Sequence, residues 1–175
     1  MYLYKSEPCS REYIRSMTRH LRKIFKTEDR LYFPVMGLLE SLHELSKSFY
    51  IDVVADKDLP INMEANTDVL NHVITMRQSV YDGAFGGNGR DRFTISHEIG
   101  HYLLPHVFGV RLQRNLPDAR LRKYEDPEWQ ADVFAGELLM PWHLVQGMDA
   151  VEIMEKCGVS WDAANVQVQI MRRAG

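Results

Sequence analysis

Apolar residues recur at helical spacing in the first part of the chain, and this pattern predicts two helices. The first runs over residues 11–26 with Ser10 as its N-cap, and the second opens at Pro34 and continues through Leu45. The residues expected to face the core are Ile14, Met17, Leu21 and Ile24 in the first helix, and Met36, Leu38, Leu39, Leu42 and Leu45 in the second.

The other face of the first predicted helix is strongly basic. Its cations are Arg11, Arg15, Arg19, Arg22, Lys23 and Lys26, against one acidic residue, Glu12. A face of this kind is usually solvated, which is the interpretation we favour. Docking of an acidic partner is the alternative.

Two segments further along have the character of β-strands. FYIDVVA, residues 49–55, is aromatic and β-branched, and HVITM, residues 72–76, alternates apolar and polar positions. We expect HVITM either to bind a substrate peptide as an edge strand or to lie wholly inside its sheet. The segment GAFGGNGRD, residues 83–91, holds four glycines and is expected to be a loop.

The loop leads into RFTISHEIGHYLLP, in which His97, Glu98 and His101 form an H-E-x-x-H pattern. On a helix, positions i and i+4 share one face, so His97 and His101 can bind a single metal ion, unless the pattern is an accident of a helix with two histidines. Glu98 lies one residue round the helix, where it can reach a water on that ion. Gly100 is a poor helix former, and its presence suggests close approach by another element.

Both ends of this short helix are marked in the sequence. Asp91 or Thr94 can cap its start, and Pro105 is expected to end it after Leu104.

A metal ion bound by His97 and His101 needs a third protein ligand, which could be a histidine, a cysteine or a carboxylate. A metzincin would carry glycine at position 104 and histidine at 107, but the chain has Leu104 and Val107 there. The two cysteines, at positions 9 and 157, lie in no ligand-like motif. A carboxylate from a second helix is the class that remains, as in the two-histidine, one-glutamate set of thermolysin-type enzymes.

The segment EDPEWQADVFAGELLMP, residues 125–141, predicts that second helix, with Asp126 as N-cap and Pro127 at its first position. Glu128 and Asp132 are four residues apart and therefore share a face. We expect Glu128 to bind the metal and Asp132 to accept the free ring N–H of a ligand histidine. The alternative is that both are ordinary surface charges near a helix start.

The blocks GNGRDRFTISHEIGHYLLP and DPEWQADVFAGELLMP resemble the two signature blocks of the ImmA/IrrE family of bacterial zinc metallopeptidases. The resemblance is good over residues 60–141. It implies His97, His101 and Glu128 as metal ligands, Glu98 as the catalytic residue, and a helix-turn-helix repressor as substrate, with a role in mobile-element or stress control. The fold it implies is α+β, a compact zincin-like domain with a small antiparallel or mixed sheet and two site helices.

The ligand set suggests the chemistry. Zinc held by two imidazoles and one carboxylate keeps a position for water, and Glu98 is placed to take the proton of that water as general base. Iron, cobalt or manganese could occupy the same ligands. Candidates for a donor to the oxyanion, or for other substrate contacts, are Tyr102, His106, Tyr124 and Arg92. The competing function is a metal-bearing but non-hydrolytic binding protein, for example one half of a toxin–antitoxin-like pair.

The tail predicts a helix, a Gly-Val-Ser turn and a second helix capped by Ser160. This spacing resembles a DNA-binding helix-turn-helix, but the basic residues Arg172 and Arg173 stand at the far end of the second helix and Asp162 stands at its start. We therefore expect a helical pair packed against the peptidase core or a partner, with DNA binding as the weaker alternative.

Composition limits the remaining choices. The 175 residues are 45% hydrophobic and 26% charged with a net charge of −3, which predicts one globular domain without an electrostatic case for nucleic acid or membrane binding. Within it we expect N-terminal helices and a strand (10–58), a zinc-site core (60–141) and a C-terminal helical appendage (142–175). The start of the chain has no apolar leader-like run, and two distant cysteines suit unpaired thiols in a cytoplasmic protein.

Overall fold

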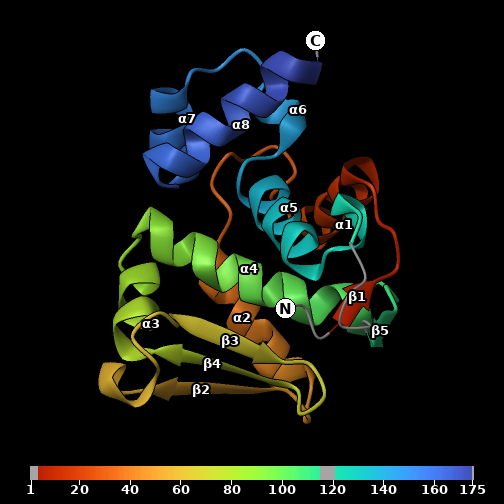
Figure 1. Ribbon diagram of the computed structural model, residues 1–175. Helices are drawn as coiled ribbons and strands as arrows, with labels where there is room; N and C mark the ends of the chain where they lie inside the picture. The colour runs from red at the N-terminus through yellow and green to blue at the C-terminus, as the bar shows by residue number, and fades with distance from the viewer. Residues whose placement is uncertain (1–3, 115–120, 175) are drawn as a thin grey trace.

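Helices and short strands share the fold, which confirms the α+β class (Figure 1). The computed structural model describes residues 4–114 and 121–174. The helices are α1 (Arg11–Ile24), α2 (Val35–Leu45), α3 (Gln78–Phe85), α4 (Gly89–His106), α5 (Pro127–Leu139), α6 (Trp142–Val145), α7 (Ala150–Cys157) and α8 (Trp161–Ala174). The strands are β1 (Tyr4–Ser6), β2 (Tyr50–Val54), β3 (Ala65–Asp68), β4 (Val73–Arg77) and β5 (Leu112–Arg114), with single 3₁₀ turns at Asp56–Asp58 and Lys123–Glu125.

The main sheet has the order β2-β4-β3, so the strand that contains HVITM is central. β4 pairs in parallel with β2 and antiparallel with β3, and its side chains Ile74 and Met76 are fully buried. The hypothesis that HVITM is an edge strand is therefore wrong, because hydrogen bonds occupy both of its sides. The edges are β2 and β3. The sequence did not predict β3, because three of its four residues, Ala65, Asn66 and Asp68, have low strand propensity.

A second, two-stranded sheet joins the strand before α1 to the strand that follows α4. β1 pairs antiparallel with β5, and Figure 1 shows this small sheet beside the far end of α4.

Helix α4 is longer than the sequence predicted at both ends. It begins at Gly89, and its cap is Asn88, whose side chain accepts hydrogen bonds from the backbone N–H groups of Arg90 and Asp91. The expected loop over 83–91 shrinks to residues 86–88, because α3 runs to Phe85. Pro105 lies inside the last turn, where it removes one i→i−4 backbone hydrogen bond, and the helix ends one residue later at His106.

The core forms where α1, α4 and α5 meet, and most of the predicted core residues are buried. Met36 and Leu42 are partly buried, and Ile24 and Leu45 are 61% and 86% exposed because each is the last residue of its helix.

The basic face of α1 is only partly solvated, contrary to the favoured interpretation. Arg22 is fully buried and donates to the carbonyl oxygens of Leu138, at 2.6 Å, and Thr27, at 3.1 Å. Its guanidinium satisfies carbonyls at the end of α5 and in the turn after α1, which explains why a charged side chain is buried there.

The C-terminal helices α7 and α8 pack on the core, as expected for a helical pair (Figure 1). Gly158 ends α7 with a φ of 63°, and the hydroxyl of Ser160 accepts a hydrogen bond from the N–H of Ala163. Gln167 of α8 donates to the carbonyl of Met140 at 3.2 Å, which ties the pair to the end of α5.

The two cysteines and the apolar character of the helices bear on the expectations drawn from composition. Cys9 and Cys157 are free thiols, and both are buried. In the described part of the chain, no helix combines the length and the apolar character that a membrane span requires.

Candidate metal centre

The closeness of α4 and α5 creates the site. A β-carbon on Gly100 would lie 3.0 Å from Cδ1 of Phe134, so any larger residue here would require Phe134 to shift by a few tenths of an ångström. The inference that Gly100 marks a close approach is thus confirmed. At the start of α5, Asp126 caps the helix and Pro127 takes its first position, both as predicted.

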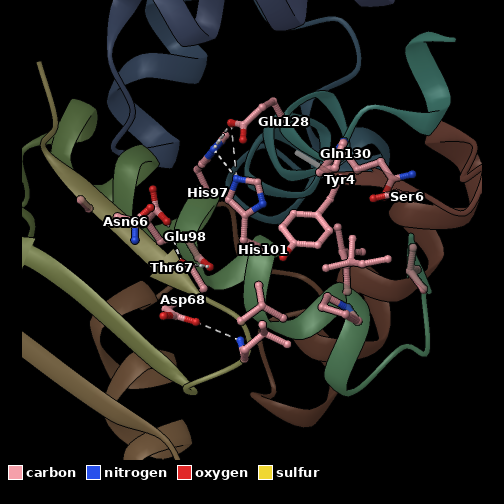
Figure 2. Close-up of a pocket in the computed structure, with 18 residues that line it drawn as sticks. Tyr4, Ser6, Asn66, Thr67, Asp68, His97, Glu98, His101, Glu128 and Gln130 are labelled. Atoms are coloured by element: carbon pink, nitrogen blue, oxygen red, sulfur yellow. Dashed lines mark hydrogen bonds and ion pairs between the residues drawn. The ribbon is translucent and has the colours of Figure 1, made fainter. Parts of the chain in front are cut away.

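Three potential ligand atoms converge between these two helices (Figure 2). Oε2 of Glu128 lies 3.3 Å from Nε2 of His97 and 3.4 Å from Nε2 of His101, and the two Nε2 atoms are 3.0 Å apart. Donors placed about 2.0–2.1 Å from a tetrahedral zinc ion are roughly 3.3 Å from one another. The spacing and chemistry of these three side chains therefore fit a zinc ion.

Asp132 lies one turn after Glu128 and contacts the same histidine from the other side of its ring. Its Oδ1 is 2.9 Å from Nδ1 of His97, which leaves Nε2 of that ring facing Glu128 and His101. The expectation that Glu128 and Asp132 share a face directed at α4 agrees with this geometry.

The carboxylates strongly influence the titration of the site. Burial lowers the pKa of His97, but hydrogen bonds with Asp132 and Glu128 and the charge of Glu98 overcome this effect and raise it to about 10. Hydrogen bonds with His101 and His97 hold the pKa of Glu128 well below its usual range. Both shifts show that the cluster favours positive charge at its centre.

Glu98 lies beside the ligand cluster, only 8% exposed, and β3 provides its partner. The hydroxyl of Thr67 is 2.7 Å from Oε2 of Glu98 and 3.0 Å from the carbonyl oxygen of the same residue. Sequence reasoning missed Thr67, because the segment around it carries no strand signal that would place it next to α4.

The cluster opens into a cleft of about 640 Å³ between β3 and the site helices (Figure 2). All four residues of β3 line it, as do Glu98, the three converging side chains, and Tyr4 and Leu112 of the small sheet. Within residues 4–114 and 121–174, β3 pairs only with β4, so its other edge is left to face this cleft.

None of the four nominated oxyanion donors lines the cleft. Arg92 is fully buried and donates to the carbonyl of Phe33 at 2.7 Å and to that of Cys157 at 2.9 Å. It precedes His97 by five residues, which rotates it by about 140° around the helix and away from the ligand face. Its nomination from sequence proximity was wrong.

The other three nominees are also engaged elsewhere. Tyr102 packs against Phe49, with 4.5 Å between ring centroids, and Nε2 of His106 is 2.8 Å from the carbonyl of Val69. Tyr124 accepts a hydrogen bond from Arg122. The polar side chains that do line the cleft near the cluster are those of Asn66, Thr67, Asp68, Tyr4 and Gln130.

Comparison with known proteins gives a family match. A family model described as Peptidase_M78, IrrE N-terminal-like domain, matches residues 87–168, a span that begins just before α4 and ends within α8. No curated protein matches the chain significantly.

Proposed function

We propose that the chain is a zinc-dependent endopeptidase that cleaves a regulatory protein, because the model of the Peptidase_M78, IrrE N-terminal-like family matches residues 87–168. The family match confirms the resemblance seen in the signature blocks. The observation that carries the proposal is the convergence of His97, His101 and Glu128 within 4.8 Å of one another, next to a buried glutamate.

In the proposed enzyme, His97, His101 and Glu128 hold the metal. Zinc at this position supplies a water of pKa about 7 and polarises the scissile carbonyl. Glu98 takes the proton of the attacking water and delivers it to the leaving amine. Thr67 binds one carboxylate oxygen of Glu98, so the other oxygen is available for that proton.

The proposed binding mode for the substrate uses the free edge of β3. An extended peptide that adds to this edge is held by backbone hydrogen bonds and passes over the ligand cluster, because β3 forms one wall of the cleft. In this proposal β3, and not the HVITM strand, binds the substrate peptide.

The proposed target class is a helix-turn-helix repressor, and a role in mobile-element or stress control follows from it. The support for this class is the family resemblance. A protein target also agrees with a cleft that has the edge strand β3 along one wall.

The test compares the wild-type protein with Glu98→Gln, using as substrate a purified repressor encoded beside its gene. The substitution is nearly isosteric and leaves the three ligands unchanged, so zinc content and melting temperature should not change. Cleavage measured by mass spectrometry should fall by roughly 10²–10⁴-fold. Stable binding of the repressor by the wild type without any cleavage would contradict the proposal and favour the non-hydrolytic binding protein.

A further inference from the structure

A second hollow lies between α4, α5 and α8, on the side of the site helices away from β3. Its volume is about 670 Å³. Two helical stripes form its walls, one on each side: Trp129, Val133, Gly136 and Met140 from α5 and its end, and Ala163, Val166 and Ile170 from α8. The spacing of three and four residues in both stripes makes each wall a continuous apolar ridge.

A smaller hollow lies between the groove and the cleft. Ala65 and Glu98 line the cleft and also this smaller hollow of about 560 Å³. It is lined as well by Arg90 and Thr94, which are wall residues of the groove. Because neighbouring hollows share wall residues, the groove lies close enough to the cleft to bind a second part of the same substrate.

The rim of the groove around Trp129 is positive. The charged lining residues of the groove are Arg11, Arg90, Lys123 and Arg173 against Asp132 and Asp162, and Arg90 is paired with Glu64. Arg11 and Arg15 share one carboxylate, that of Glu137, so this cluster keeps an excess positive charge. Cζ of Arg11 and Nζ of Lys123 lie 6.0 and 5.7 Å from the ring centroid of Trp129, so two cations border the apolar wall.

We propose that this groove is a docking site for an acidic amphipathic helix of the protein substrate, outside the segment that is cut. A third helix fits between two ridges of helical spacing by inserting residues at positions i, i+3 or i+4, and i+7. Acidic residues on its polar face then meet the cations at the rim. The proposal rests on the proposed peptidase function and adds a class of recognition element to it.

The proposal is tested by binding, so that its failure is distinct from a failure of catalysis. The probe is a fluorescein-labelled peptide with Leu on one helical face and Glu on the others, titrated with the Glu98→Gln protein and followed by anisotropy. It should bind at least about tenfold more tightly than a shuffled peptide of the same composition and than a peptide with Lys in place of Glu. Equal binding of all three peptides would overturn the proposal.

Matched variants locate the binding. Val166→Glu in the groove should weaken binding about tenfold, whereas Val151→Glu on α7, outside it, should have no effect. The two valines are 54% and 50% exposed, so neither change disturbs the core. Lys123→Glu should also weaken binding, in contrast to Lys57→Glu, an exposed lysine far from the groove wall. If the groove variants behave like their controls, the peptide binds elsewhere and the proposal is wrong.

A second copy of this chain is the competing occupant. Sedimentation of the wild-type protein should show a monomer at the concentrations of the titration. A dimer that Val166→Glu dissociates would assign the groove to self-association and overturn the proposal.

Discussion

Oδ1 of Asp132 lies 2.9 Å from Nδ1 of His97, and this contact joins the second helix of the candidate site to the first. If it orients the ring for metal binding, Asp132→Ala should lower zinc affinity by about 10–100-fold while the fold remains intact. Competition with a chromogenic chelator measures this affinity. Asp162→Ala, an exposed aspartate on α8, is the control and should bind zinc like the wild type. Wild-type affinity in Asp132→Ala would reopen the ligand assignment, with Glu125 as the next residue to test, since the carboxylate of Glu137 is buried and paired with Arg11 and Arg15.

The metal content provides a separate prediction. Protein purified without chelator should contain about one zinc ion per chain, consistent with a single three-ligand cluster in the described residues. The double variant His101→Ala, Glu128→Ala leaves one of the proposed ligands and should contain almost no zinc by elemental analysis. Full occupancy in the double variant would show that the ion is bound elsewhere.

Thr67 is predicted to position Glu98. Thr67→Val keeps the size of the side chain but removes the donor at 2.7 Å, and a hydrogen bond to a charged group contributes about 1.5–3 kcal/mol. We expect kcat to fall by roughly 10–100-fold with KM little changed. Thr67→Ser restores the hydroxyl and should recover most of the activity, a result that a purely structural role of Thr67 would not produce.

The metal cluster was predictable from sequence because its residues lie on two helices with strong local signals. The spacing of His97 and His101, and of Glu128 and Asp132, determines which side chains share a helix face, and the caps and Pro127 fix where α5 begins. The meeting of the two faces was not visible in the sequence, apart from the hint given by Gly100.

Contacts between distant segments were not predictable. Thr67 reaches Glu98 from a strand whose residues have low strand propensity, and only the pairing with β4 holds that strand in place. Arg22 and Arg92 read as solvated or catalytic in sequence, yet both are buried by contacts with backbone carbonyls far along the chain. A sequence pattern shows which residues are charged. The backbone carbonyls that make burial of such a side chain favourable are brought to it only by the tertiary structure.

The buried role of Arg92 leads to a stability prediction. Arg92→Met keeps much of the volume but leaves the carbonyls of Phe33 and Cys157 without their donor. We expect the free energy of unfolding to fall by about 2–4 kcal/mol in urea denaturation. The neighbouring Arg90→Met removes a guanidinium that is 73% exposed, and should change stability by no more than about 0.5 kcal/mol. Equal effects of the two substitutions would contradict the assigned role.

The contact of Arg92 with the turn after α7 also affects how genetic data on this protein should be interpreted. The guanidinium emerges from α4, the helix of His97 and His101, and it donates to the carbonyls of Cys157 and Gly158. A nonsense mutation after Pro141 would leave every proposed ligand codon intact and still remove two of the three carbonyl acceptors of that guanidinium, along with Gln167 and the apolar cover of α5. Loss of function in such an allele would therefore show only that α4 has lost contacts that support it. Alleles that change Glu98 are needed to test the catalytic step itself.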